Sequence, residues 1–361
     1  MKLENISLIN FRNYENLTLD FHPNLNIFLG QNAQGKTNLL ESIYFLALTR
    51  SHRTHHDREL IGWEEKEMAV SGSVSKANTS IPLKVTMDKK GRTAYVNRLK
   101  ENKLADYIGQ LNLIMFAPED LELIKGSPSI RRRFLDMELG QIRPVYLYDS
   151  LRYSRVLKER NSYLKFDKDK MDNNFFDVLD QQLMEHGQKI MEHRQEFIQK
   201  LEKYAQIIHK QLTHDKEHLT IHYQKKVQKD FAKELLERRD VDIFRHQTTV
   251  GPHRDDLQFF INDMNVAEFG SQGQQRTVAL SIKLAEIDLI FEETGEYPIL
   301  LLDDVMSELD NHRQLDLIET SLGKTQTFIT TTTLDHLKNL PDNLKIFQVE
   351  QGQIKENKYK S

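Results

Sequence analysis

The chain has 361 residues, of which 39% are hydrophobic and 29% are charged. This balance is typical of a globular protein, and the length favours two structural units. Because the sequence contains no cysteine, disulfides, iron–sulfur clusters and thiolate zinc sites are excluded. No apolar run approaches the roughly 20 residues that a membrane helix needs, and no signal-peptide core follows Met1. We therefore expect a soluble, cytoplasmic protein that does not contact a membrane.

Positive charge is concentrated in one part of the chain. The net charge is -4, but residues 125–165 contain ten basic residues against four acidic ones, a local charge of +6. This asymmetry favours a surface that faces a polyanion, and it includes Arg131, Arg132 and Arg133. A solvated helical face explains the same pattern equally well, so both interpretations stay open.

The first part of the chain has the pattern of a mixed α/β unit. Short apolar stretches predict strands at residues 3–8, 17–21, 25–29, 68–74, 81–87 and 93–96. A loop at residues 30–37 separates the third strand from a helix that we expect at residues 38–48. Lys89-Lys90-Gly91 is a candidate hairpin turn.

Long helical patterns begin near Arg131. Apolar residues recur every seven positions at Phe176, Leu183, Ile190, Phe197 and Tyr204. This spacing predicts one long amphipathic helix, with Gly187 as a candidate kink. Strand and helix patterns return near Thr248. We therefore expect an α/β unit built from both chain ends, residues 1–128 and 246–361, with an all-helical arm inserted at residues 129–245.

One segment matches the phosphate-binding loop G-x-x-x-x-G-K-[ST] at every fixed position. The loop and the residue after it provide the candidate nucleotide contacts Gly30, Gln31, Asn32, Ala33, Gln34, Gly35, Lys36, Thr37 and Asn38. Gly30 and Gly35 let the backbone fold around a phosphate, and the helix start near Lys36 favours anions. The lysine side chain is suited to the β- and γ-phosphates, and the Thr37 hydroxyl is suited to Mg²⁺. This pattern predicts ATP binding.

A second acidic element completes this candidate site. The apolar run Ile299-Leu300-Leu301-Leu302 is typical of a central parallel strand, and Asp303 and Asp304 stand at its end. Beside a phosphate loop, Asp303 is the expected ligand of Mg²⁺ and Asp304 the expected general base. A helix-capping turn is the alternative explanation for the two acids.

A further anion-binding helix start lies about 30 residues earlier. Ser271 is a plausible N-cap of a strongly apolar helix, and Gly273 permits close approach of another backbone. By itself, this segment is explained as well by an ordinary capped helix.

These segments together resemble ABC-type ATPases. Ser271-Gln272-Gly273-Gln274-Gln275 looks like their signature motif, and Asp303-Asp304 with Ser307-Glu308-Leu309-Asp310 resembles their Walker B motif and D-loop. A helical insertion of this length between the motifs is similar to the SMC-like branch. Within that branch the chain resembles the RecF family of bacterial DNA replication and repair proteins. The matching stretches are Asn10-Phe11-Arg12-Asn13-Tyr14, Ser51-His52-Arg53-Thr54, Phe116-Ala117-Pro118-Glu119-Asp120-Leu121, Lys125-Gly126-Ser127-Pro128, Arg131-Arg132-Arg133-Phe134-Leu135-Asp136 and Gly251-Pro252-His253-Arg254-Asp255-Asp256-Leu257.

The resemblance implies an ABC-type head that closes into a homodimer on ATP and Mg²⁺ and opens after slow hydrolysis. In such a dimer Ser271, Gly273, Gln274 and Gln275 of one copy face the nucleotide of the other, and Asp310 lines the seam. It also implies a weak ATPase that associates with the nucleoid, binds duplex and gapped DNA, and helps RecO and RecR to load RecA. Candidate DNA contacts are Arg50, Arg53, Arg131, Arg132 and Arg133.

Two departures from the ABC pattern favour slow hydrolysis. Residues 328–333 end in threonines where such proteins carry a γ-phosphate-sensing histidine, and His336 comes later. No Q-loop glutamine can be placed, and Pro118-Glu119-Asp120 stands in its region. Two alternatives remain open at this stage: an ABC transporter ATPase subunit, and a structural DNA clamp with incidental ATP turnover. His214, His218 and His222 are four residues apart, but the strand-like sequence around His222 favours surface histidines over a metal site.

Overall fold

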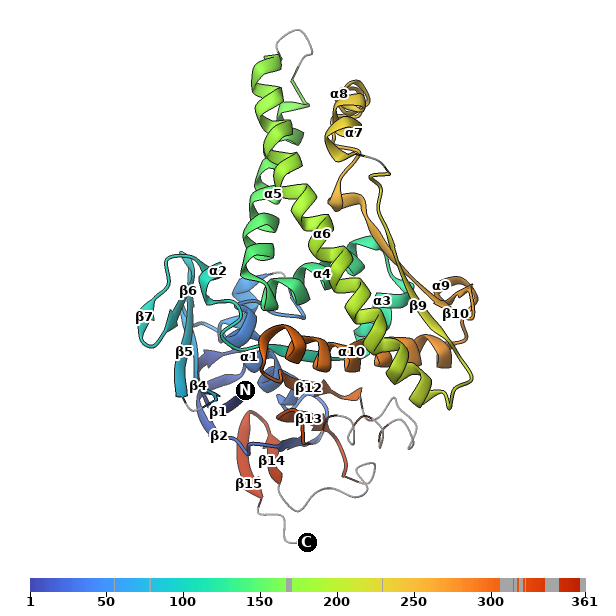
Figure 1. Ribbon diagram of the computed structural model, residues 1–361. Helices are drawn as coiled ribbons and strands as arrows, with labels where there is room; N and C mark the ends of the chain where they lie inside the picture. Colours follow the sequence, from blue (N-terminus) through green and yellow to red (C-terminus); the bar gives the residue numbers. More distant parts are fainter. Residues whose placement is uncertain are drawn as a thin grey trace. The chain divides into compact units, whose positions relative to one another are not determined.

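The computed structural model describes residues 1–54, 56–77, 79–166, 171–228, 230–305, 314, 317, 321, 323–334 and 344–357. Its internal contacts divide the chain into two compact units (Figure 1). The head unit comprises Met1–Asp120 with Leu280–Ser361, and the inserted unit comprises Leu121–Ala279. In the described part of the chain, no helix has both the length and the hydropathy to cross a bilayer.

The head unit contains a six-stranded antiparallel sheet. Its strands, in spatial order, are β2 (Tyr14–Asp20), β1 (Lys2–Phe11), β4 (Met68–Lys76), β5 (Thr79–Asp88), β6 (Gly91–Val96) and β7 (Leu99–Lys100). Buried and partly exposed side chains alternate along β4, which is the pattern of a sheet with one covered face. The strands predicted here from alternation are confirmed.

The second sheet of the head unit carries the phosphate loop. Its order is β15 (Gln353–Asn357), β14 (Leu344–Glu350), β3 (Leu25–Leu29), β13 (Thr327–Thr331), β12 (Ile299–Asp303) and β8 (Leu113–Phe116). Every neighbouring pair is parallel except β14 with β15. All five residues of β12 are buried, as its unbroken apolar run predicts. The rings of Phe28, Phe328 and Phe347 pack together across β3, β13 and β14.

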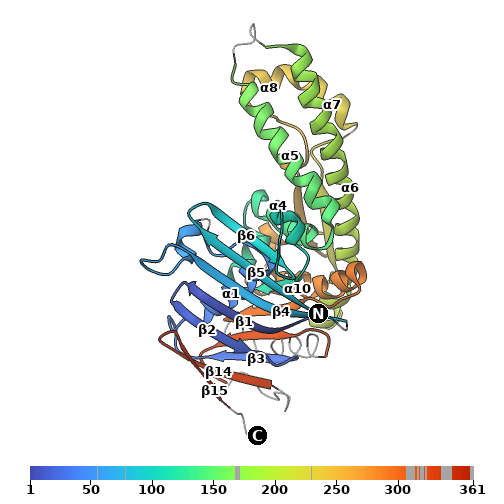
Figure 2. The same cartoon turned by 90° about the vertical axis from the view of Figure 1, so that its left-hand side faces the viewer.

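Helix α1 (Lys36–Leu48) follows β3 and contacts strands of both sheets, so it lies between them (Figure 2). Its residues are buried on nearly all sides, which is consistent with its uniformly apolar sequence. The remaining short helices of this unit are η1 (Asp57–Leu60) and α2 (Leu104–Tyr107), and η2 (Pro118–Leu121) follows β8.

The inserted unit is mainly helical. Its helices are α3 (Glu122–Lys125), α4 (Pro128–Ile142), α5 (Pro144–Tyr163), α6 (Asn173–Leu212), α7 (Phe231–Glu237), α8 (Arg239–Arg245), η4 (Pro252–Arg254) and α9 (Val266–Phe269). The predicted long amphipathic helix is α6, whose 40 residues correspond to about 60 Å. It runs without interruption through Gly187, where a Cβ atom would lie 2.5 Å from Phe231 and 2.9 Å from Tyr153. Gly187 therefore makes room for two rings and is not a break in the helix.

The inserted unit also contains strands, so it is not all-helical as the sequence suggested. Strand β10 (Asp256–Ile261) pairs with β9 (Leu219–Gln224) and with β11 (Met264–Asn265). Because β9 and β10 are hydrogen-bonded along their whole length, residues after 245 group with the insertion and not with the head. Helix α10 (Gln272–Thr294) begins in the inserted unit and ends in the head unit.

Candidate nucleotide site

The phosphate loop has the backbone conformation that phosphate binding needs. Strand β3 ends at Leu29, and the Gly30 N–H donates to Thr331 O on the neighbouring strand at 3.2 Å. Ala33 and Gly35 both have positive φ angles, 63° and 113°, which turn successive N–H groups toward one side. Gly30 is also required sterically, because a Cβ atom there would lie 2.3 Å from Val349 O.

Lys36 is the cation of this loop. Its Nζ donates to Gly30 O at 2.6 Å and to Gln31 O at 2.8 Å, so the loop's own carbonyl groups hold the ammonium group over the loop. Burial lowers the pKa of Lys36, while the negative charges of Asp304 and Asp303 raise it. A buried ammonium group at a helix N-terminus, next to two carboxylates, is placed to receive a polyanion together with a divalent cation.

Residues 266 positions apart meet next to the loop. Thr37 Oγ1 donates to Asp303 Oδ1 at 3.1 Å, and Thr330 Oγ1 donates to the same oxygen at 2.8 Å. Burial raises the pKa of Asp303, and the hydrogen bonds from Thr330 and Thr37 oppose that change. A hydroxyl and a carboxylate this close supply hard oxygen donors, the chemistry that Mg²⁺ prefers. The described side chains therefore fit a magnesium ion held by Thr37 and Asp303.

Asp304 begins the turn after β12. It has a positive φ angle of 53°, an unusual conformation for a residue with a side chain, and its N–H donates to Thr330 Oγ1 at 2.9 Å. The single Thr330 hydroxyl thus holds both acids. In the sequence this threonine stood out only as a departure from the ABC pattern, and its contact with the two acids was not predicted. The parallel pairing of β12 with β13 places Thr330 opposite Asp303.

A buried carboxylate on the helix that follows the phosphate loop was not predicted from the sequence either. Glu41 on α1 is fully buried and accepts two hydrogen bonds from the guanidinium group of Arg12, at 2.8 and 2.7 Å. It also accepts a hydrogen bond from the Ser51 hydroxyl at 2.5 Å. The hydrogen bonds from Arg12 and Ser51 lower the pKa of Glu41, against the effect of burial. Glu41 therefore joins the turn after β1, helix α1 and the segment after α1.

Asn38 and Arg53 form a polar rim beside the loop. Asn38 Nδ2 donates to Asn13 Oδ1 at 2.8 Å, and Arg53 Nη1 donates to Asn38 Oδ1 at 2.9 Å. The Arg53 side chain is 44% exposed and lies 3.6 Å from Glu41. Arg50 is partly exposed. Both arginines keep access to solvent.

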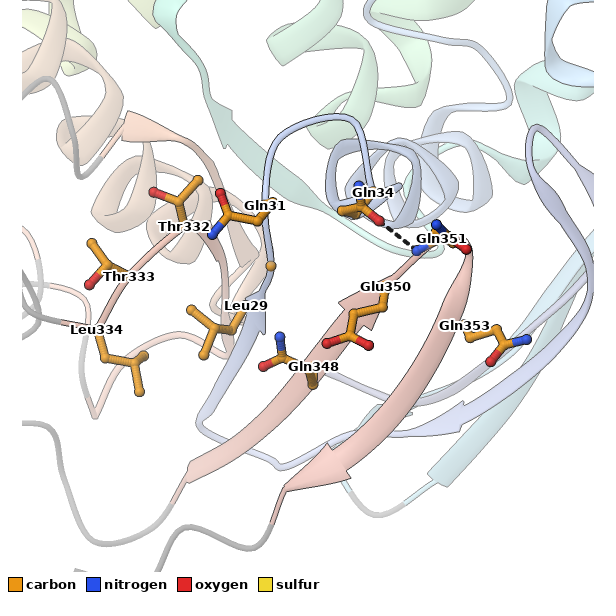
Figure 3. Close-up of a pocket in the computed structure, with 11 residues that line it drawn as sticks. Leu29, Gln31, Gln34, Thr332, Thr333, Leu334, Gln348, Glu350, Gln351 and Gln353 are labelled. Atoms are coloured by element: carbon orange, nitrogen blue, oxygen red, sulfur yellow. Dashed lines mark hydrogen bonds between the residues drawn. The ribbon is translucent and has the colours of Figure 1, made fainter.

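The turn between β14 and β15 holds the other side of the loop. The Gln351 N–H donates to Gln34 Oε1 at 2.7 Å (Figure 3). The Gly352 N–H donates to Gln34 O at 3.1 Å. A pocket of about 820 Å³ opens here, lined by Leu29, Gly30, Gln31, Gln34, Thr332, Thr333, Leu334, Gln348, Glu350, Gln351 and Gln353. It borders the first half of the loop, whereas Thr37 and Asp303 lie outside its lining.

The signature-like segment lies in the inserted unit and starts α10. Ser271 is exposed and caps the helix reciprocally: its Oγ accepts from the Gln274 N–H at 3.2 Å, and its N–H donates to Gln274 Oε1 at 2.9 Å. A Cβ atom on Gly273 would meet only Ser271 Oγ, at 3.9 Å. Gln274 Nε2 donates to Glu217, and Gln275 Nε2 donates to Val266 O. Both glutamine side chains therefore bind within their own chain.

The three candidate DNA-binding arginines of the inserted unit differ in accessibility. Arg131 is 8% exposed and forms two hydrogen bonds with Asp256, at 2.7 and 3.1 Å. Arg132 donates to Asp255 O at 2.8 Å. Arg133 is exposed. Arg131 thus stabilises the contact between α4 and β10, and its charge is already compensated.

The other expected positions fall into two groups. His222 lies in strand β9 and His214 in the turn after α6, and the described residues contain no cluster of three His, Cys, Asp or Glu side chains that could hold a metal ion. Asp310, the other residues of the expected D-loop, and His336 lie outside the described residues.

Comparison with known proteins agrees with this geometry. The family model described as "RecF/RecN/SMC N terminal domain" matches residues 2–355. The DNA replication and repair protein RecF of Lactococcus lactis subsp. lactis (strain IL1403) is 75% identical over 356 residues, which cover 99% of each chain.

Two solved structures of the recombination mediator protein RecF in the RecFOR pathway are also similar, each with 33% sequence identity. The RecF-ATP structure has a TM-score of 0.91 and covers 99% of this chain and 97% of that chain. The RecF-ATPrS structure has a TM-score of 0.90 and covers 98% of this chain and 97% of that chain. Both chain ends form the head unit, and the phosphate loop meets Asp303 within it. Together with these similarities, this shows that the chain belongs to the RecF family.

Proposed function

We propose that this protein is an ATP-dependent DNA-binding switch of replication and recombinational repair. The observation that carries the proposal is the contact between Thr37 and Asp303, because it joins the phosphate loop to the second acidic motif. Relatives named for DNA replication and repair, and similar structures of RecF-ATP and RecF-ATPrS, support this assignment. They disfavour an ABC transporter subunit.

In this proposal ATP binds along residues 30–38, with Lys36 on the β- and γ-phosphates. Thr37 and Asp303 hold Mg²⁺, which neutralises phosphate charge when it is bound. Asp304 accepts a proton from the attacking water. The hydrogen bond from the Asp304 N–H to Thr330 fixes the backbone position from which the Asp304 carboxylate projects.

ATP also brings two copies together. Ser271 and Gly273 of one copy face the nucleotide of the other, and Asp310 lines the seam between them. The exposed hydroxyl of Ser271 and the open space over Gly273 support this role. Because the side chains of Gln274 and Gln275 are bound within their own chain, we assign them to shaping the helix start.

DNA binding and partner proteins complete the proposal. The exposure of Arg53 and Arg133 and the partial exposure of Arg50 support contacts with DNA phosphates. Arg131 is instead bound to Asp256 within the inserted unit. The assembly works with RecO and RecR to place RecA on gapped DNA in the nucleoid. The RecFOR pathway of the similar solved structures supports these partners.

Sedimentation of Asp304→Asn with ATP, Mg²⁺ and gapped DNA tests the proposal. We expect a dimer with ATP, because the variant does not hydrolyse the ATP that holds the two copies together. We expect a monomer with ADP, and tighter DNA binding by the dimer than by the monomer. Ser271→Arg in the same background is the control, because it should bind ATP and remain monomeric. A monomer of Asp304→Asn under all conditions would contradict the ATP-driven switch.

A structural clamp with incidental turnover is the second candidate, favoured by the threonines of residues 330–333 in place of a γ-phosphate-sensing histidine. Steady-state ATP hydrolysis with and without gapped DNA separates the two. Stimulation by DNA supports the switch, and an unchanged low rate supports the clamp.

A further inference from the structure

Helix α5 of the inserted unit has two different faces. Its buried stripe, at alternating spacings of three and four residues, consists of Tyr146, Asp149, Tyr153, Val156 and Arg160. Arg160 anchors this stripe through ion pairs with Asp180 at 2.6 Å and with Asp242 at 2.7 Å. The buried stripe therefore holds α5 firmly in the unit and leaves the rest of its surface free to face outward.

The outward surface combines apolar and basic side chains, and we call it the α5 docking face. It consists of Val145, Tyr148, Leu151, Arg152, Arg155 and Lys158. The three apolar side chains are 62%, 50% and 54% exposed and occupy the first two turns of the helix. The basic side chains follow in the next turns, with Glu159 as the acidic residue among them.

The aromatic side chain of this face is held in place. The guanidinium group of Arg152 lies 5.4 Å from the centre of the Tyr148 ring. The His186 ring lies 6.1 Å from the Tyr148 ring, and His186 itself is hydrogen-bonded to Asp149 at 2.8 Å. A Tyr–Arg pair that is already ordered loses little conformational entropy on binding, which is a property of interface hot spots.

The positive charges of this face have no ion-pair partner in the part of the chain that the structure describes. Among the residues that the structure describes, no ion pair involves Arg152, Arg155 or Lys158. On α6, Glu185 forms its ion pair with Lys189 of the same helix, at 3.3 Å. A complementary partner of this face would carry negative charge and would cover Val145 and Leu151.

We propose that the α5 docking face binds an acidic, apolar-centred surface of a partner protein in the repair assembly. The basic side chains of the face favour an acidic rim on the partner, and the exposed aliphatic side chains favour an apolar centre on the partner. The DNA backbone offers phosphates for the basic side chains but no extended apolar surface that would cover Val145 and Leu151. The proposal rests on the proposed function, which supplies RecR and RecO as the partners to be tested.

Two double variants test this face in the full-length chain. Val145→Ser with Leu151→Ser removes the apolar centre, and Arg155→Glu with Lys158→Glu reverses the rim. Matched controls are Ile207→Ser, an apolar residue of α6 that is 51% exposed, and Lys89→Glu with Lys100→Glu on the exposed surface of the head unit. Circular dichroism confirms that each variant folds. Affinities for purified Lactococcus lactis RecR and RecO, and for gapped duplex DNA, are measured for all of them.

We expect both double variants to weaken binding of RecR or RecO by about tenfold or more, with the controls close to wild type. Loss of DNA affinity in the charge-reversal variant alone, with unchanged protein binding, would show a DNA contact and overturn the proposal. Wild-type affinity of both variants for both proteins would also overturn it. If the wild type binds neither protein, the proposal fails with the partner part of the proposed function, while ATP-dependent dimerisation and DNA binding still test the rest.

Discussion

The phosphate loop and the signature-like segment are both helix starts, but their polar groups are satisfied differently. In the head unit, Lys36 is held by its own loop and Asp303 by Thr37 and Thr330, so the site is organised without a ligand. In the inserted unit, Ser271 is exposed and Gly273 has open space above it. The first region holds its charged groups in place around a phosphate loop, whereas the second leaves Ser271 exposed and has space above Gly273, as the proposed contact with a second copy requires.

The largest effect is expected at the most enclosed group. Lys36→Ala should weaken ATP binding by about 100-fold, because it removes a desolvated cation from the phosphates. Isothermal titration with ATP and Mg²⁺ measures this. Lys89→Ala, an exposed lysine of the same unit, serves as the control. An affinity within a few-fold of wild type would show that the phosphates bind elsewhere.

Two glycines sharpen the comparison. Gly273→Ala should leave thermal stability unchanged or slightly higher, since no atom crowds the new methyl group and alanine favours the helix. It should nevertheless weaken ATP-dependent dimerisation by about tenfold. Gly30→Ala should instead lower the melting temperature, because its Cβ atom would lie 2.3 Å from Val349 O. Scanning fluorimetry and sedimentation separate the two outcomes, and equal destabilisation would remove the contrast.

A moderate effect is expected at the hydroxyl that joins the two acids. Thr330→Val removes the bonds to Asp303 Oδ1 and from the Asp304 N–H. We expect the Mg²⁺ concentration for half-maximal ATP hydrolysis to rise by about fivefold, corresponding to about 1 kcal/mol. Thr327→Val, a buried residue of the same strand, should leave the magnesium dependence unchanged.

The smallest effect concerns the inserted unit alone. His253 Nδ1 lies 2.6 Å from the Tyr153 hydroxyl and Nε2 lies 3.0 Å from Thr248 O, an arrangement that suits neutral imidazole. Burial lowers the pKa of His253 from 6.5 to about 4. Between these values the unfolded chain takes up a proton that the folded chain excludes, so stability falls as the pH decreases from 6.5 toward 4.

Urea unfolding from pH 7 to 4 measures this dependence in wild type and in His253→Gln. The variant should be less stable at pH 7 and should show a shallower loss of stability in the window from 6.5 to 4. A parallel loss in both proteins would assign the pH dependence to other groups.

The parts predictable from sequence are those whose chemistry depends on local spacing. The phosphate loop, the apolar strand before Asp303 and the heptad pattern of α6 are all local patterns, and the structure has each of them in place. The pairing of β9 with β10 joins residues more than 30 positions apart, so spacing could not show that the insertion contains a sheet. Arg131 was expected at the surface, but its partner Asp256 is 125 residues away and holds it inside.

The turn after β14 has a practical consequence for handling the protein. Gln351 and Gly352 hold Gln34, so the phosphate loop depends on a hairpin that ends at Asn357. Clipping by a protease within residues 344–357, or trimming the chain there to aid crystallisation, would remove a neighbour of β3 together with this support. Affinity tags and fluorophores are therefore better attached through a spacer after Asn357 than in place of the hairpin.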